Sequence, residues 1–201
     1  MDVQTEKGKM RILFEDNLNN EAGIIQKIVK NVFNIDCEIK KGNFSKLLKF
    51  KKSLEGYEIQ IAKRFRDDII LTSKDLFPYG SNSKEDDWVF GFASKQKQFF
   101  ISVARLKTNS DNPSKKLEIS KKKYQKRIEF IILHELGHRL IKKQKHYKEF
   151  ILTNPKTEYR SSFGMHCPDN KCIMSEFIDI RDMDKHIKMN YKSLFCRRCL
   201  K

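Results

Sequence analysis

The pentapeptide His134-Glu135-Leu136-Gly137-His138 lies within residues 120–140, where apolar residues recur at helical intervals. This repeat predicts a helix with one broad apolar stripe. The stripe comprises Tyr124, Ile128, Ile131, Ile132, Leu136 and Leu140, and Ser120 is the expected N-cap. On such a helix His134 and His138 project from nearly the same face, so both imidazoles can reach one metal ion. We therefore predict a helix that carries two zinc ligands.

Glu135 lies beside the histidine pair and is turned away from it on the helix. A carboxylate in that position can hold and deprotonate a water molecule without ligating the metal. Gly137 costs a helix about 1 kcal/mol relative to alanine, which an ordinary core helix has little reason to accept. The alternative is a coincidental pentapeptide on an amphipathic helix. We predict Glu135 as a catalytic general base.

Four of the five cysteines form two close pairs near the C-terminal end of the sequence: Cys167, Cys172, Cys196 and Cys199. Two such pairs separated by a loop are typical of a tetrahedral four-thiolate zinc site. The alternative is two disulfides, which residues 1–7 disfavour because they lack the apolar stretch of a secretory signal. We therefore expect structural zinc and a reducing cytoplasmic location. The remaining Cys37 is expected to be a buried or unreactive thiol.

A catalytic zinc needs a third protein ligand, and the sequence offers His166 and His146. His166 adjoins Cys167, so a structural zinc would help to position it. If the helix continued past His138, His146 would lie about 12 Å further along it, well beyond a metal–nitrogen bond of about 2 Å. We predict His166 as the ligand, with His146 as the competitor. His186 is expected to be a surface residue.

The motifs resemble those of the archaemetzincin family, which combines HExxH, a downstream Gly-x-His-Cys-x4-Cys-x-Met and a final Cys-x-x-Cys. The downstream residues here are Gly164, His166, Cys167, Cys172, Met174, Cys196 and Cys199. The segments 70–77, 88–93 and 101–106 are similar to strands that precede the family's active-site helix. The likeness thus extends over most of the chain, and its metal motifs are the most diagnostic part.

The resemblance implies a zincin-like or metzincin-like α+β fold with a mixed sheet, packed helices and a small zinc-stapled C-terminal subdomain. It implies two zinc ions: a catalytic ion on His134, His138 and His166, and a structural ion on the four paired cysteines. Glu135 would be the general base, and Met174 would form the methionine turn beneath the metal. We expect one metallopeptidase domain over residues 1–201, divided into 1–138, 139–163 and 164–201.

The segment 139–163 departs from the family pattern, in which the glycine and the third ligand follow the helix almost at once. His166 is also two residues beyond its glycine, where the family usually has three. The segment is rich in lysine and includes Tyr147, Phe150, Ile151 and Tyr159. We expect it to extend the helix and return as a flap over a cleft.

The first half of the chain alternates strand and helix patterns. We expect strands at 10–14, from Cys37 and at 69–72, with helices around 24–33 and 57–66. The order indicates a mixed sheet crossed by the active-site helix. The segment 99–103 is expected either to bind an extended peptide at the cleft rim or to fill the core.

The charge is strongly basic, with 42 lysine and arginine residues against 26 acidic ones and a net charge of +16. This balance favours polyanions such as nucleic acid or acidic substrates, although a lysine-rich solvated surface explains it more simply. No apolar run reaches the length of about 18 residues that a membrane span requires, so we expect no membrane association.

The leading hypothesis is a zinc-dependent metallopeptidase that acts on peptide or protein substrates. One alternative is a SprT-like protease acting on DNA-bound protein, which Met174 and the strand segments before the helix disfavour. The other alternative is a catalytically inactive, zinc-stabilised binding protein, motivated by the displaced third ligand. Zinc content and DNA-stimulated cleavage discriminate among the three.

Overall fold

The computed structural model describes residues 10–15, 17–42, 48–60, 68–78, 88–93, 98–109, 118–141, 145–153, 160–177, 179–189 and 194–200. Its internal contacts divide the chain into two compact units, Met1–Arg139 and Leu140–Lys201. Among the described residues, no helix combines the length and apolar character that crossing a membrane demands.

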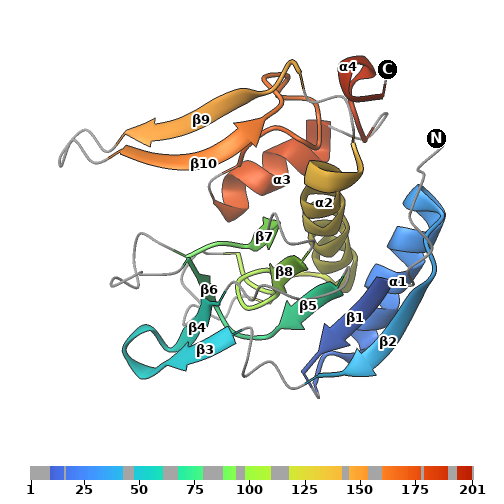
Figure 1. The fold of residues 1–201 in the computed structure, drawn as a ribbon, viewed down its shortest axis with the longest axis vertical. Coiled ribbons are helices and arrows are strands. Elements are labelled where there is room, and N and C mark those ends of the chain that lie inside the picture. Colours follow the sequence, from blue (N-terminus) through green and yellow to red (C-terminus); the bar gives the residue numbers. More distant parts are fainter. Residues whose placement is uncertain are drawn as a thin grey trace. The chain divides into compact units, whose positions relative to one another are not determined.

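The first unit is built on a five-stranded sheet in the order β2-β1-β5-β8-β7 (Figure 1). Its strands are β1 (Met10–Phe14), β2 (Cys37–Lys41), β5 (Asp68–Thr72), β7 (Gly91–Ala93) and β8 (Gln98–Ser102). All pairs are parallel except β7 with β8, so β7 is an antiparallel edge strand. Every residue of β5 and β8 is buried, as expected for central strands covered on both faces.

A smaller sheet in the order β3-β4-β6 adds a second layer to this unit. It consists of β3 (Leu48–Lys51), β4 (Gly56–Ile59) and β6 (Leu76–Phe77), with the short 3-10 helix η1 (Lys52–Leu54) between its first two strands. Leu48, Ile59 and Leu76 pack with Ile70 of β5 and Phe100 of β8 in one buried apolar cluster. The cluster joins the two sheets through apolar side-chain contact.

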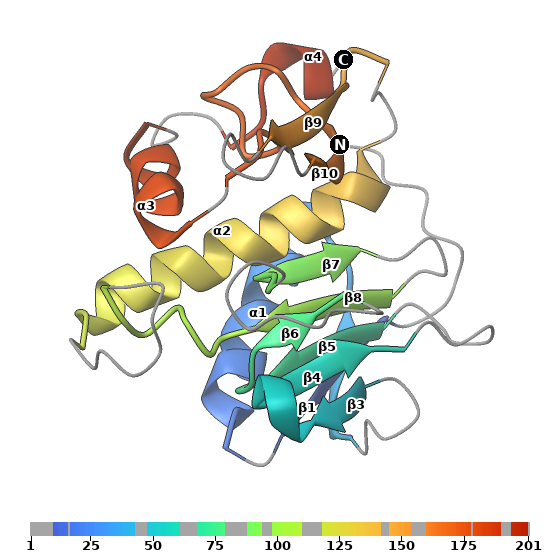
Figure 2. The ribbon, with the colours of Figure 1, turned by 90° about the vertical axis from the view of Figure 1, so that its left-hand side faces the viewer.

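Two helices complete the first unit: α1 (Asn19–Phe33) and α2 (Lys121–Leu140). The α1 helix packs on β1 and β2, and Figure 2 shows α2 running alongside the main sheet, next to β7. Arg127 of α2 is fully buried and donates hydrogen bonds to the carbonyl oxygens of Leu106 and Thr108, at 2.8 and 2.6 Å. Tyr124 donates to Glu21 of α1 at 2.9 Å. These bonds fix the position of α2 against α1 and the segment that follows β8.

The second unit contains an antiparallel hairpin of β9 (Lys148–Thr153) and β10 (Arg160–His166), shown in orange in Figure 1. The pairing register shifts between Ser162 and Met165, and the ladder resumes with Met165 opposite Glu149 and His166 opposite Lys148. The helices α3 (Ile180–Met189) and α4 (Arg197–Leu200) follow. Two of the four paired cysteines, Cys196 and Cys199, lie immediately before and within α4.

Several sequence predictions are confirmed by these elements: the strands at 10–14, 37–40 and 69–72, the helix around 24–33 and the helix over 120–140. The predicted helix at 57–66 is wrong over 57–59, which belong to β4 and pair with both β3 and β6. Residues 61–66 lie outside the described part of the chain. The local spacing of apolar residues does not reveal these long-range strand pairings, which override helical periodicity.

Two further predictions need correction. The segment 99–103 does not form a rim strand, because β8 ends at Ser102 and is paired on both sides by β5 and β7. Its core-filling alternative is the correct one, and the strand expected at 101–106 instead begins at Gln98. The segment 139–163 does not extend the helix beyond Leu140, and its residues 148–153 belong to the hairpin strand β9.

Candidate functional site

The two histidines of the pentapeptide converge on α2. His134 and His138 are one helical turn apart, and their Nε2 atoms are 3.1 Å apart. Two nitrogens held by one tetrahedral zinc at about 2.0–2.1 Å lie about 3.3 Å apart, so the pair fits that ion. Phe130, a further turn back, stacks on the His134 ring. The helix therefore presents two imidazole nitrogens at metal-binding separation.

Glu135 lies between these histidines in the sequence. Its side chain is buried and faces β7. A Cβ added at Gly91 of β7 would lie 2.5 Å from the Glu135 Oε1 and 2.7 Å from its Cγ. Glycine at position 91 therefore leaves room for the Glu135 carboxylate that any side chain would occupy. Gly91 could not be singled out from the sequence, because neither segment encodes the approach of β7 to α2.

His166 is the last residue of β10 in the second unit and is buried. Its Nε2 lies 2.6 Å from the Glu176 Oε2. A carboxylate beside a histidine ring is the arrangement that commonly orients metal-binding histidines. The role of His166 as third catalytic ligand stays a prediction, and Glu176 is a neighbour that the sequence did not single out.

The four paired cysteines gather in the second unit. Cys167 and Cys196 have sulfurs 3.7 Å apart, Cys196 and Cys199 3.6 Å, and Cys172 and Cys199 3.5 Å. All five cysteines of the chain are described, and all are free thiols, so the disulfide alternative is wrong. Thiolates bound at about 2.3 Å to one tetrahedral zinc lie about 3.8 Å apart, which these separations approach.

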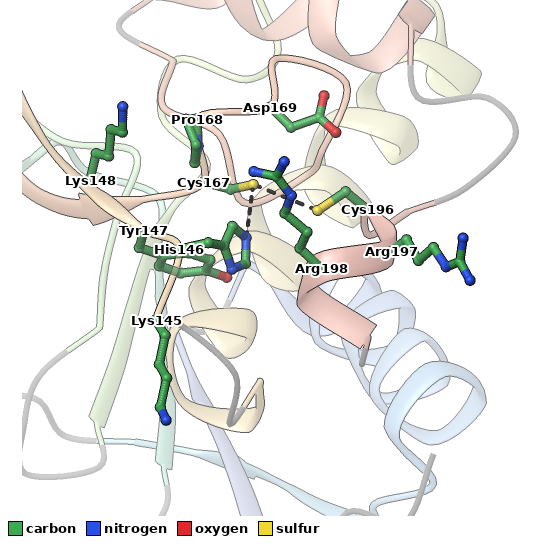
Figure 3. Close-up of a pocket in the computed structure, with 10 residues that line it drawn as sticks. All are labelled: Lys145, His146, Tyr147, Lys148, Cys167, Pro168, Asp169, Cys196, Arg197 and Arg198. Atoms are coloured by element: carbon green, nitrogen blue, oxygen red, sulfur yellow. Dashed lines mark hydrogen bonds between the residues drawn. The ribbon is translucent and has the colours of Figure 1, made fainter.

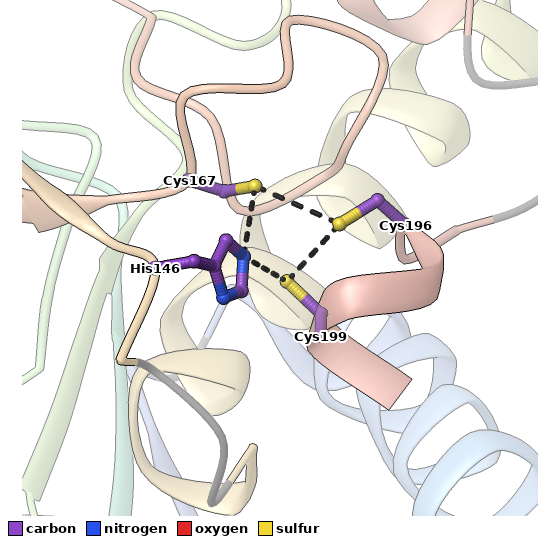
Figure 4. A group of neighbouring side chains, drawn as sticks. All are labelled: His146, Cys167, Cys196 and Cys199. Carbon is purple, nitrogen blue, oxygen red and sulfur yellow. Dashed lines mark hydrogen bonds between the residues drawn. The ribbon is translucent and has the colours of Figure 1, made fainter. Parts of the chain in front are cut away.

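His146 joins this cluster, which the sequence did not predict. Its Nε2 lies 3.3 Å from the Cys167 Sγ and 3.5 Å from the Cys199 Sγ (Figure 4). The donor atoms of His146, Cys167, Cys196 and Cys199 all lie within 4.8 Å of one another. The part of the chain that the structure describes thus brings five soft or borderline donors to one place.

The thiols perturb one another strongly. Hydrogen bonding from Cys199 and from backbone N–H groups lowers the pKa of Cys172 to about 6, although burial opposes this. Burial raises the pKa of Cys167 to about 12, and the hydrogen bond to Cys172 raises that of Cys199. Several thiolates can share so small a space only when a cation neutralises them.

A pocket of about 780 Å³ opens beside the cysteine cluster (Figure 3). Its lining includes the four cations Lys145, Lys148, Arg197 and Arg198, against the acidic residue Asp169. Figure 3 shows the Arg198 side chain reaching across the pocket near Cys167 and Cys196. The pocket is therefore strongly positive and adjoins the candidate metal donors.

The three other residues that the sequence singled out, Met174, His186 and Cys37, are all buried. Met174 is buried in the turn after Cys172, and its carbonyl oxygen accepts a hydrogen bond from the Cys167 N–H at 2.9 Å. His186 was expected at the surface but is buried, with Nδ1 3.1 Å from the Ser175 hydroxyl. Burial raises the pKa of Cys37 to about 11, consistent with an unreactive thiol.

No protein-family model and no curated protein sequence matches the chain. Two solved structures do. Archaemetzincin AmzA from Archaeoglobus fulgidus, in complex with malonate, matches with a TM-score of 0.62 and 20% identity, over 96% of this chain and 98% of that one. A zinc-dependent peptidase from Methanocorpusculum labreanum matches with a TM-score of 0.61 and 17% identity, over 95% and 97%. The predicted α+β, zincin-like fold is confirmed, and the chain has the fold of the archaemetzincin structure.

Proposed function

We propose that the protein is a zinc-dependent metallopeptidase whose catalytic centre is carried by α2. The observation that supports this most directly is the 3.1 Å separation of the His134 and His138 Nε2 atoms, with Glu135 between them. The likeness to a zinc-dependent peptidase supports the same activity. We propose His166 as the third ligand and Glu176 as the residue that orients its ring.

The chain's own residues divide the work of peptide hydrolysis. The three histidines would hold a zinc ion, which would supply Lewis acidity towards the scissile carbonyl and the attacking water. Glu135 accepts a proton from the attacking water on its carboxylate and then delivers it to the departing amine. Gly91 leaves room for that carboxylate beside β7.

Glu135→Gln tests this assignment. The amide cannot accept the proton, so we expect turnover of a peptide library to fall by about 10²–10⁴-fold while zinc content stays at the wild-type value. Glu129→Gln, on the same helix but outside the pentapeptide, is the matched control and should retain activity. Undiminished turnover in zinc-loaded Glu135→Gln contradicts the proposed role.

We further propose a structural zinc ion at the cysteine cluster, which gives two ions in all. The donor–donor separations of 3.5, 3.6 and 3.7 Å among the cysteines support it. Cysteine thiolates are the ligands that structural zinc favours. The four predicted ligands are Cys167, Cys172, Cys196 and Cys199, and Met174 is proposed to form the turn beneath the catalytic ion.

The positive pocket favours a second candidate, cleavage of protein bound to DNA in the manner of SprT-like proteases. Four cations beside one acid suit a phosphate backbone, and such binding weakens steeply with salt. Cleavage of a DNA-bound protein with and without duplex DNA, at low and high salt, separates the candidates. DNA stimulation that Arg197→Ser/Arg198→Ser removes supports the second candidate. Equal cleavage rates with and without DNA support a peptidase that does not depend on DNA. Zinc-loaded protein that shows no turnover supports the catalytically inactive binding protein.

A further inference from the structure

The cysteine cluster has one donor more than zinc requires. Structural zinc sites are almost always four-coordinate, with four cysteines, three cysteines and one histidine, or two of each as ligands. Four cysteines and His146 meet here, so one of the five must stay outside the coordination shell. Which one stays outside determines whether the segment before the β9–β10 hairpin is attached to the metal.

We infer that His146 is the fourth ligand of this metal, with Cys167, Cys196 and Cys199, and that Cys172 is a hydrogen-bonded neighbour. The inference rests on the proposed structural zinc. It replaces the four-cysteine set that the sequence motif implies with a set of three cysteines and one histidine.

Donor geometry carries the inference. A zinc-bound imidazole nitrogen lies about 3.6 Å from each thiolate of the same tetrahedron, given bonds of about 2.0–2.1 Å and 2.3 Å. His146 Nε2 is 3.3 Å from one sulfur and 3.5 Å from another, close to that value on two edges. The two sulfur–sulfur edges among Cys167, Cys196 and Cys199, at 3.7 and 3.6 Å, approach the separation of about 3.8 Å expected for zinc thiolates.

Charge also favours the histidine. Cys167 and Cys199 are buried, and three thiolates with a neutral imidazole leave a zinc site with one fewer negative charge than four thiolates do. Tyr147, which directly follows His146 in the chain, supports the same arrangement, because its hydroxyl lies 3.5 Å from the Cys199 sulfur. The pair can therefore bind the metal and hold one of its thiolates.

Cys172 has other partners that satisfy its sulfur. The Cys196 backbone N–H donates to it at 3.3 Å, and the Cys199 sulfur lies at 3.5 Å. Its Sγ is not in the group of four donors that lie within 4.8 Å of one another. A sulfur atom held by these contacts can support the ligands without binding the ion.

The coordination of His146 gives the metal a second structural role. His146 lies just before β9, whereas Cys167 directly follows β10. The ion would therefore hold the two strands together at the open end of the hairpin, where Lys148 pairs with His166. The segment 139–163, which departs from the archaemetzincin pattern, would then supply a metal ligand of its own, His146.

Substitution of 113Cd for zinc provides the test. We expect the His146 imidazole to show scalar coupling to the cysteine-site cadmium and the cadmium resonance to lie upfield of that of a four-thiolate site. In zinc competition titrations, His146→Asn should weaken binding at this site by more than about 100-fold, beyond the 10–100-fold that loss of a supporting contact costs. Cys172→Ser should stay within about that 10–100-fold range.

His186→Asn is the matched control, since His186 is a buried histidine of the same unit that hydrogen-bonds Ser175. It should leave the cadmium spectrum and the zinc affinity unchanged, with folding checked by circular dichroism. A four-thiolate cadmium shift, with Cys172→Ser losing the ion and His146→Asn retaining it, overturns the inference and leaves the structural zinc in place. Wild-type protein that binds no metal at the cluster overturns both.

Discussion

The two units of the molecule are organised around different kinds of interior. In the first, the central strands β5 and β8 are buried along their whole length, and apolar side chains from two sheets meet in one cluster. In the second, three of the buried side chains are the thiols of Cys167, Cys172 and Cys199. The first unit can be stabilised by apolar burial alone, whereas we expect the second to depend also on a metal ion bound by its cysteines.

The two units should therefore differ in how much their folding depends on a bound metal ion. A metal site contributes most to folding where the surrounding core is too small to fold alone. The histidine pair lies on α2, which buried Arg127 anchors independently of any ion. In the second unit, the candidate metal donors lie among buried apolar side chains such as Ile173, Met174 and Phe177. Loss of metal should therefore affect the two units unequally.

Chelation should produce the largest effect. Removal of zinc withdraws on the order of 10 kcal/mol from a metal-dependent unit. Hydrogen exchange should show the amides of β9, β10 and α3 losing protection, while those of β5 and β8 keep theirs. Readdition of zinc is the control and should restore protection. Equal protection of both units after chelation would contradict the comparison.

Ile70→Ala tests the opposite side. Ile70 is fully buried between the two sheets, so its truncation should cost the first unit about 2–5 kcal/mol in urea unfolding. Zinc bound at the cysteine cluster should not change. Ile28→Ala, at a half-buried position of α1, is the control and should cost clearly less. Zinc lost in proportion to stability would show that the units are not energetically distinct.

Gly91→Ala should separate activity from stability within the first unit. The added methyl group would meet the flexible end of Glu135, which can move, so the unfolding free energy should fall by about 1 kcal/mol, at the low end of the cost of overpacking. A displacement of the base by about 1 Å can nevertheless lower turnover by about 10²-fold.

Gly23→Ala in α1 is the matched control, because an added Cβ there meets nothing within 4 Å. It should stabilise the helix by about 0.5–1 kcal/mol and leave turnover unchanged. Full activity in Gly91→Ala would show that the Glu135 position tolerates this displacement.

Thiol reactivity provides the smallest and most local test. Since burial raises the pKa of Cys37 to about 11, this thiol is protonated at about pH 8 and becomes a thiolate only as the pH rises towards that pKa. Because we expect chelation to unfold the second unit and expose its cysteines, iodoacetamide should modify these first at this pH and the still-buried Cys37 slowly. Mass spectrometry of the peptides measures the order, and rapid modification of Cys37 would contradict it.

Local patterns predicted the elements whose signals are self-contained. The helix over residues 120–140 and the approach of His134 and His138 depend on local spacing, and both are confirmed. Burial is not confined to the predicted apolar stripe, because Arg127, Phe130 and Leu133 are buried as well. The pattern around Tyr57 failed because pairing with β3 and β6 decides the conformation there. Periodicity cannot reveal which segments will pair.

The donor set of the cysteine cluster could be predicted only in part. Close cysteine pairs have a recognisable spacing, whereas His146 reaches the cluster because α2 ends at Leu140. A helix that continued past His138 would instead place His146 far from any metal bound by His134 and His138. Glu176 and Gly91 likewise lie beside His166 and Glu135 through tertiary contacts that no short motif contains.

The most direct test of the two-centre account is the zinc content of folded wild-type protein, His134→Ala, His166→Ala and Cys199→Ser, measured by elemental analysis. We predict about two ions per chain in the wild type and about one in each variant, since closed and catalytic zinc sites are distinct. Catalytic turnover should be lost in both histidine variants. A single ion in the wild type that survives in His134→Ala and His166→Ala would contradict the catalytic centre.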